Sequence, residues 1–328
     1  MYKYCFLLVF ILIIFSFKKG TEYTLNYPKS WPKPVYDFKK NPLDSSIVKL
    51  GKMLFNDPIL SRDGSISCSS CHLQQTGFTH IDHDLSHGID GKIGNRNSLA
   101  LINLAWMKSF MWDGAIHHID VQALAPIENP NEMDNSIKNV VSTLQKSPRY
   151  RNKFAEVYGD SIISGSRVLK TIAQYCLSLV SCNSKYDKVI AQHSDVKFTE
   201  QEQKGYEIFK SKCNNCHTEP LFTNNTFQRN GIEIDPTLND IGRMKVTQLK
   251  KDSMLFKVPT LRNIAITSPY MHDGRFQNLQ MVLFHYSTNN KMNIELGEQD
   301  KKALIAFLKT LTDEEFLRDK TYSYLGSE

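Results

Sequence analysis

The chain has 328 residues, and 41% of them are hydrophobic, so it is long enough for one large domain or for two ordinary ones with real cores. Its formal net charge is +6, and part of that charge belongs to Lys3, Lys18 and Lys19 near the N-terminus. Lysine and arginine form no dense run with interleaved aromatic residues. The composition therefore argues against a nucleic-acid-binding protein.

The N-terminus predicts export. The run CFLLVFILIIFSF (5–17) has thirteen residues without a charge and follows Lys3. It is too short for a comfortable membrane span and has the length of a signal-peptide core. Residues 1–22 are predicted to be a signal peptide, or an uncleaved anchor because no clear small-x-small cleavage pattern follows. In either case the folded part is expected outside the cytoplasm, and no later stretch looks transmembrane.

Two C-x-x-C-H motifs carry the chemistry, SCSSCH (67–72) and CNNCH (213–217). A zinc ribbon keeps its cysteine pairs close together and needs no histidine after each, whereas 145 residues separate Cys68 from Cys213. A thioredoxin-like disulfide would want a βαβ context, which is absent. Covalent c-type haem explains every residue of both motifs. The predicted thioether cysteines are Cys68, Cys71, Cys213 and Cys216, and the predicted proximal iron ligands are His72 and His217.

The two remaining cysteines of the folded part have a simpler interpretation. Cys176 and Cys182 lie six residues apart in a segment with helical periodicity, which makes a disulfide between them geometrically unfavourable. We expect both to be buried free thiols.

The chain repeats itself beyond the cysteines. GKMLF (51–55) and GYEIF (205–209) each precede a motif, and the second helix is expected to start at Thr199, with Glu202 completing a capping box. Further on, LINLA (101–105) matches LRNIA (261–265), and in each copy an Asp-Gly follows with seven residues between. The sequence thus predicts a duplicated, mainly α-helical chain. The predicted parts are two tandem cytochrome c-like domains with one haem each, at 30–192 and 198–313, an amphipathic last helix at 298–312, and a C-terminal tail at 314–328 that packs back on the first domain.

The duplication allows the sixth coordination positions of the two haem irons to be compared. Tyr286 comes thirteen residues after Asp273, and Pro126 comes thirteen residues after Asp113. Proline cannot bind iron, so the first haem is predicted to be open where the second is closed by Tyr286. Other candidates near the second haem are Met271, Met281 and His285. One open and one closed haem suit an enzyme with its own electron supply, whereas a plain electron carrier would close both.

Polar residues around the open position are candidate catalytic groups. The segment VQALAPIENPNEM (121–133) supplies Gln122, Glu128 and Glu132. Cleavage of peroxide needs a base that takes a proton from one oxygen and returns it to the other, and Glu132 is the preferred candidate. Trp112 precedes the first Asp-Gly and is a candidate electron relay between the haems, or an ordinary core tryptophan.

Several motifs together resemble the bacterial di-haem cytochrome c peroxidase family: RDGSISCSSCH, MWDG, QALAPIENPNEM, CNNCH, PTLRNIAITSPYMHDG and the last helix. The resemblance implies a periplasmic homodimeric enzyme that reduces hydrogen peroxide with electrons from a small c-type cytochrome or a cupredoxin. It implies that Gln122 and Glu132 line the peroxide pocket of the His72 haem and that Trp112 lies between the haems. It also implies a calcium ion held by the side chain of Asn97 and the carbonyls of Thr267 and Pro269, a donor set that suits a hard cation.

Two positions depart from that family pattern. Many members have methionine where this chain has Tyr286, and an anionic phenolate favours ferric iron. A tyrosine at this position resembles the MauG-type di-haem enzymes, which oxidise tryptophans of a partner protein. A histidine caps the open haem in some resting peroxidases. His87 could do so here, with His80 and His83 as other candidates, although its spacing is longer than usual. The sequence-level alternatives are therefore MauG-type oxidation of a partner protein and non-catalytic di-haem electron transfer.

Overall fold

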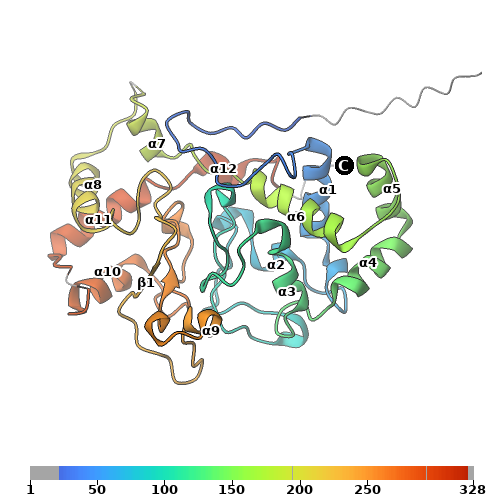
Figure 1. Ribbon diagram of the computed structural model, residues 1–328. Coiled ribbons are helices and arrows are strands. Elements are labelled where there is room, and N and C mark those ends of the chain that lie inside the picture. The colour runs from blue at the N-terminus through green and yellow to red at the C-terminus, as the bar shows by residue number, and fades with distance from the viewer. Residues whose placement is uncertain (1–21, 194, 293, 324–328) are drawn as a thin grey trace, which may run out of the picture.

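The computed structural model describes residues 22–193, 195–292 and 294–323, so the predicted signal peptide or anchor at 1–22 lies almost wholly outside the described residues. The described part forms two helical lobes side by side, one from the blue-to-green half of the chain and one from the yellow-to-red half (Figure 1). The prediction of a mainly α-helical fold is confirmed. None of its described helices is long and apolar enough to cross a membrane.

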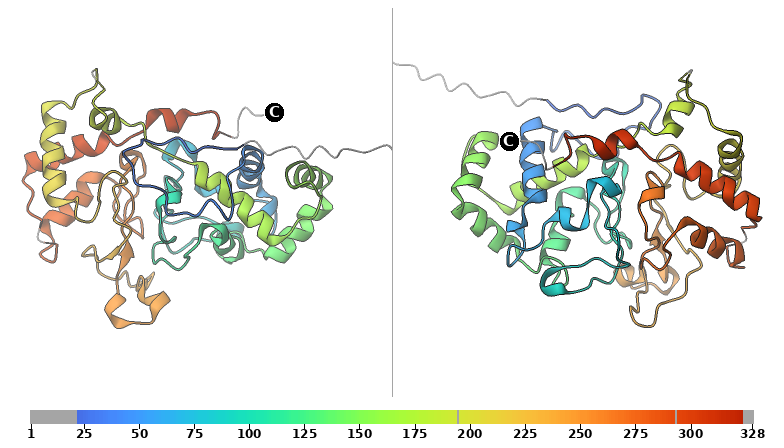
Figure 2. Two further views of the ribbon diagram at one scale, coloured as in Figure 1. Left: turned by 45° about the horizontal axis from the view of Figure 1, so that its top comes forward. Right: turned by 180° about the vertical axis from the view of Figure 1, so that it is seen from behind.

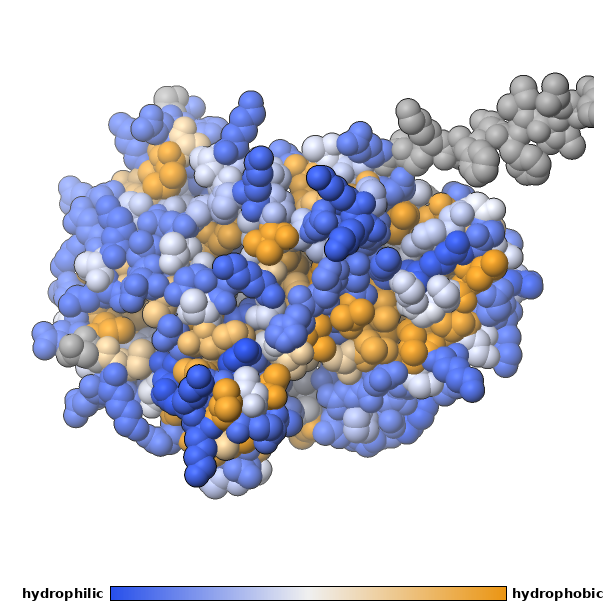
Figure 3. Space-filling model, viewed as in Figure 1, coloured by the Kyte–Doolittle hydropathy of each residue, from blue (hydrophilic) through white to orange (hydrophobic). Residues whose placement is uncertain are grey.

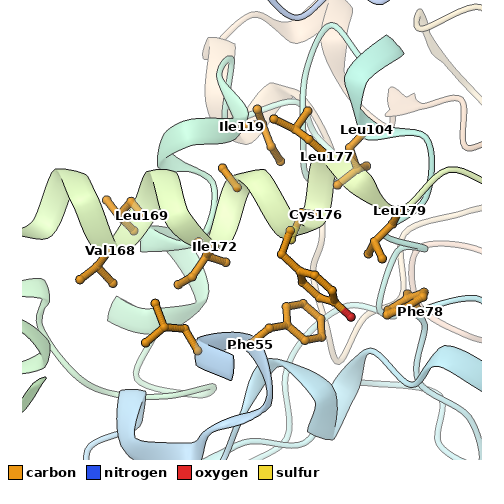
Figure 4. Packing of buried hydrophobic residues seen from close by; sticks show 14 of the residues in the cluster. Phe55, Phe78, Leu104, Ile119, Val168, Leu169, Ile172, Cys176, Leu177 and Leu179 are labelled. Atoms are coloured by element: carbon orange, nitrogen blue, oxygen red, sulfur yellow. The ribbon is translucent and has the colours of Figure 1, made fainter. Parts of the chain in front are cut away.

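The first lobe is built around helix α6. Its residues Val168, Leu169, Ile172, Cys176 and Leu177 are buried and pack towards side chains from α1, such as Phe55, and from the following loops (Figure 4). Burial of this apolar surface supplies the main driving force for the lobe. The helices of this lobe and of the connection that follows it are α1 (Ser45–Asn56), α2 (Cys68–Cys71), α3 (Leu124–Glu128), α4 (Ile137–Lys146), α5 (Pro148–Tyr158), α6 (Gly165–Ser178) and α7 (Lys185–Ile190).

The second lobe packs two long helices against each other, α8 and α11 (Figure 2). The predicted start of α8 is confirmed, because the Thr199 hydroxyl accepts from the Glu202 amide and the Glu202 carboxylate accepts from the Thr199 amide at 2.7 Å. The elements of this lobe are α8 (Glu200–Lys212), β1 (Phe227–Gln228), α9 (Met244–Thr247), β2 (Phe256–Lys257), α10 (Leu279–Thr288) and α11 (Glu298–Lys309). The two short strands are antiparallel, with Phe227 opposite Lys257.

A glycine in each repeated G-x-x-[LI]-F segment explains how the paired helices approach. A Cβ atom on Gly51 of α1 would lie 2.2 Å from the carbonyl oxygen of Thr171 in α6. The equivalent Gly205 of α8 would place a Cβ atom 2.0 Å from the carbonyl oxygen of Ala303 in α11. Only glycine permits either contact, so the repeat encodes the same close helix crossing in both lobes.

The two Asp-Gly segments also share one backbone conformation. Asn103 and Asn263 both have positive φ, at 54° and 61°, and in both copies a short 3-10 turn follows. A β-bridge then closes each segment, from Phe110 to Ile116 in the first copy and from Tyr270 to Phe276 in the second. Residues 160 positions apart in the chain therefore occupy equivalent places in the two copies.

The last described segment returns to the first lobe. Helix α12 (Glu314–Arg318) follows α11, and Gln74 Nε2 donates to the carbonyls of Phe316 and Asp319. The Lys52 ammonium donates to the carbonyl of Thr321 at 2.9 Å. These bonds attach the tail beside the first C-x-x-C-H segment.

Candidate active site

The first C-x-x-C-H segment forms a single helical turn. Cys68 and Cys71 begin and end α2, and both thiols are free. Burial raises the pKa of Cys68 to about 12 and that of Cys71 to about 11. His72 follows, and its Nδ1 lies 2.8 Å from the carbonyl oxygen of Phe78. Because this bond engages Nδ1, the other ring nitrogen, Nε2, is left to bind iron.

The second C-x-x-C-H segment has the same arrangement. Cys213 and Cys216 are also free thiols, and burial raises the pKa of Cys213 to about 12. His217 Nδ1 lies 3.2 Å from the carbonyl oxygen of Phe222 and 3.1 Å from that of Pro259. Burial lowers the pKa of the His217 ring, so the ring is neutral, as an iron ligand must be.

One cavity of about 670 Å³ reaches both segments. Cys71 and His72 line it at one end, and Cys213, Cys216 and His217 line it at the other. Trp112 lines the cavity as well, and its indole nitrogen donates to the carbonyl of Asn97 at 2.8 Å. The indole is therefore held in a fixed orientation along the space that joins the two sites.

Of the candidate catalytic residues, Gln122, Glu132 and Trp112 line this cavity, and Glu128 does not. Gln122, Pro126, Asn129 and Glu132 line it together with His72, and Gln122 Nε2 lies 3.8 Å from the sulfur of Met111. The negative charge of Glu132 contributes to the raised pKa of the Cys71 thiol, which places the carboxylate near the first C-x-x-C-H segment.

Two effects set the acidity of Glu132. Burial raises its pKa above the usual value of a glutamate, and a hydrogen bond from Asn129 Nδ2 to Glu132 Oε1, 2.7 Å long, opposes that rise. A carboxylate with a raised pKa can both accept and return a proton near neutral pH. By contrast, Glu128 is exposed and is not among the residues that line the cavity.

Tyr286 lies at the other end of the cavity. It projects from α10, and burial raises the pKa of its phenol; the nearby Cys213 and Cys216 thiols add to this effect. Met271 also lines the cavity, whereas Met281 is exposed and His285 Nε2 is 2.8 Å from the carbonyl oxygen of Asn230. Of the candidate sixth ligands to the second iron, Tyr286 and Met271 therefore line the cavity, whereas Met281 and His285 do not.

The lining fits two haem groups. Each C-x-x-C-H segment offers two free thiols and one imidazole whose Nδ1 is already engaged, which is the donor set of c-type haem. Of the four cysteines, Cys68 is the one that is not among the residues lining the cavity. Lys257 also lines the cavity; it is only 7% exposed, and burial lowers its pKa to about 8. A buried ammonium needs an anionic partner, and the propionate groups of a haem would provide one.

His87 lies beside the other two candidate capping histidines. Its ring lies 4.2 Å from that of His83 and 6.1 Å from that of His80, measured between ring centroids. None of the three is among the residues that line the cavity, although the His87 carbonyl oxygen is 3.5 Å from the Cys71 sulfur. Within the described residues, no group of three or more His, Cys, Asp or Glu side chains could hold a metal ion.

The predicted calcium ligands lie between the lobes. Asn97 is buried, and its side-chain Nδ2 donates to the carbonyls of Pro269 and Asp84, both at 3.2 Å. Thr267, two residues before Pro269, lines the cavity. Calcium binds oxygen donors, so the ion would need the Asn97 amide turned until its oxygen replaces the nitrogen at this place.

Three residues of the site went unrecognised in the sequence. Arg96 donates to Asp113 at 2.7 Å and to both carboxylate oxygens of Asp240, at 2.6 and 2.8 Å, which ties the two lobes together beside the cavity. The others are Lys257 and Asn129. Nothing local in the sequence marked the arginine or the lysine.

Comparisons with known proteins agree with this geometry. The family model described as di-haem cytochrome c peroxidase matches residues 45–195. The chain is 34% identical over 288 residues to cytochrome c551 peroxidase of Nitrosomonas europaea, covering 86% of this chain and 85% of the relative. It is also 34% identical over 307 residues to the methylamine utilization protein MauG of Methylorubrum extorquens, covering 88% and 83%. A crystal structure of a MauG-like protein associated with microbial copper homeostasis superposes with a TM-score of 0.84 at 29% identity, covering 92% and 99%.

Proposed function

Since this chain belongs to the di-haem cytochrome c peroxidase family, we propose that it reduces hydrogen peroxide to water in the periplasm with electrons from a small c-type cytochrome or cupredoxin. The observation that carries the proposal is the asymmetry of one shared cavity. Glu132 and Gln122 lie with Pro126 at the His72 end, and Tyr286 lies at the His217 end. The first end offers space and a base, and the second offers a further ligand.

A haem iron bound to His72 would provide the centre at which peroxide binds and accepts electrons. Glu132 takes the proton from the peroxide oxygen nearer the iron and returns it to the farther one, which leaves as water. Gln122 orients the bound peroxide through its amide. The overall reaction consumes one peroxide, two electrons and two protons and yields two water molecules.

Trp112 lies along the route between the two sites. Its indole is fixed by the hydrogen bond to Asn97 and stands edge-on to His272, with ring centroids 6.5 Å apart. We infer that electrons pass from the His217 end to the His72 end by way of this ring. The calcium ion, held by Asn97, Thr267 and Pro269, would fix the lobes beside it.

The test is steady-state turnover of the haem-loaded, calcium-supplied protein with peroxide and a reduced small c-type cytochrome. Glu132→Gln should lower kcat/KM for peroxide by about 10²- to 10⁴-fold, the usual contribution of a general base. Glu128→Gln is the matched control, because that carboxylate is exposed on the same segment, and it should stay close to wild type. Equal losses in both variants would remove Glu132 from the mechanism.

The assay should be run on the protein as isolated and after mild reduction. The position of the His87 ring outside the cavity supports an open first site, so equal rates in both states are expected. Activity that appears only after reduction would instead support a capping histidine.

A second candidate function is oxidation of a partner protein, as proposed for a MauG-type enzyme. Two observations favour this function: Tyr286 at the His217 end of the cavity, and the similarity to MauG. This candidate predicts that peroxide converts the protein to a long-lived oxidised form, seen in its absorption spectrum, and that no cytochrome is oxidised. Fast cytochrome oxidation would exclude it as the main activity.

A further inference from the structure

Helix α10 has two faces with different surroundings. Leu279, Leu283 and Tyr286 lie on its inner face and line the cavity at the second C-x-x-C-H segment. Met281 and Phe284 lie on its outer face and are 41% and 60% exposed. A helix with its side chains is about 10 Å thick, so this outer face is separated from the second haem site by a single helix.

The outer face forms one wall of a groove. The groove has a volume of about 810 Å³, and α11 forms its other wall with Ile305 at the base. Exposed Phe284 lies beside it, although most of the surface seen in Figure 3 is hydrophilic and shows apolar residues only in patches. An exposed aromatic ring next to an apolar groove is a common feature of a protein-binding surface.

Lysines surround this groove, which we call the α10–α11 groove. Lys301 packs its stem along the groove, with its ammonium 5.6 Å from the centre of the Phe284 ring, and pairs with Glu298 at 2.6 Å. Lys302 and Lys309 also line the groove and are exposed, and no ion pair joins either to another described residue. Their positive charges are therefore available to a partner.

We propose that the α10–α11 groove is the docking site of an acidic redox partner, which passes one electron per encounter to the His217 site through α10. This inference rests on the proposed function, since two such encounters supply the electrons that one peroxide consumes. An acidic rim on the partner meets Lys302 and Lys309, and its apolar centre covers Phe284. Complementary charge of this kind speeds association and weakens with added salt.

The proposal is tested with the haem-loaded enzyme, peroxide and a reduced acidic c-type cytochrome as the probe. The double variant Lys302→Glu/Lys309→Glu should raise KM for this cytochrome about tenfold and reverse the sign of its salt dependence. The same variant should gain activity with a basic cytochrome c. Phe284→Glu should also raise KM in the same assay, because it removes the apolar contact and adds a charge that repels the acidic partner.

A matched control uses the other basic surface, around α9. Lys250 and Lys251 are exposed there beside Leu249, which is 48% exposed. Lys250→Glu/Lys251→Glu should leave KM for the acidic cytochrome within about twofold of wild type. A larger effect in this control than in the α10–α11 pair would overturn the proposal and move docking to α9.

Turnover with a small-molecule peroxidase dye separates the two proposals. If the dye supports no peroxide reduction in the wild type, the proposed function fails. If dye turnover is normal but Lys302→Glu/Lys309→Glu has an unchanged KM for the acidic cytochrome, only the docking site fails. If Phe284→Glu changes the mass of the native assembly in solution, the groove is an interface between copies of the chain, and the docking proposal is overturned.

Discussion

Asn129 should set the lowest pH at which Glu132 can work as a base. Its side chain donates a 2.7 Å hydrogen bond to Glu132, which holds down a pKa that burial has raised. A hydrogen bond to a charged group is worth about 1.5 to 3 kcal/mol, and one pKa unit corresponds to about 1.4 kcal/mol. Asn129→Leu should therefore raise the pKa of Glu132 by about 1 to 2 units.

The sign of the effect on activity follows from the role of the carboxylate. A base acts only when it is deprotonated, so activity is lost as the pH falls through the pKa of Glu132. A higher pKa moves this acidic limb of kcat/KM to higher pH. Asn129→Asp serves as a matched variant: it keeps the side-chain oxygen that accepts from the Asn131 amide at 3.0 Å, and it adds a like charge that also raises the pKa.

The assay is kcat/KM for peroxide with a small-molecule reductant, from about pH 4 to about pH 9, where a buried carboxylate titrates. Both Asn129 variants should shift the acidic limb upwards, and Glu132→Gln should remove it along with most of the activity. Limbs that stay within about 0.3 units of wild type in both variants would show that Glu132 is not the titrating base. If the acidic limb shifts in the Asn129→Leu variant alone, the effect comes from the lost hydrogen bond between the Asn131 amide and the side-chain oxygen of Asn129.

Two further predictions concern the second site and the lobe junction. Tyr286→Met should raise the reduction potential of the second haem by on the order of 0.1 V, because methionine favours ferrous iron more than a phenolate does; Tyr270→Phe, which changes another tyrosine of the same cavity, should leave it unchanged in a redox titration. Arg96→Met should lower the free energy of unfolding by about 3 to 5 kcal/mol, because it leaves buried Asp113 and Asp240 without their partner. Denaturant titration checks this, with the exposed Arg318→Ala as the control that should change stability by less than about 0.5 kcal/mol.

Features that depend on local spacing could be predicted from the sequence. The N-cap at Thr199 and the buried free thiol of Cys176 appear as expected. Cys182 is also a free thiol but is only partly buried, which differs from the prediction. The equal Asp-Gly spacing also predicted that Pro126 and Tyr286 occupy comparable places, and both line the cavity. These residues follow from covalent proximity and helix geometry, which the chain specifies locally.

Features that depend on contacts between lobes could not be predicted in this way. The bond from Arg96 to Asp240 joins residues 144 positions apart, and the burial of Lys257 depends on how β2 packs beside Trp112. The orientation of His87 depends on the path of its loop, which turns the ring towards His83. Sequence spacing does not specify a side-chain direction, so His87 stays a candidate ligand.

The duplicated backbone explains why a few side chains are sufficient to give the two sites different roles. Met111 and Met271 both adopt positive φ, at 66° and 74°, and Gly114 and Gly274 have the same φ of 70°. The chain thus follows one path over both sites, and the sites differ mainly in what that path carries. A proline, which cannot bind iron, lines the cavity at position 126, and a tyrosine, which can, lines it at position 286. The shared backbone thus presents different side chains to the two sites, and the proposed difference between an open and a closed site requires no different fold.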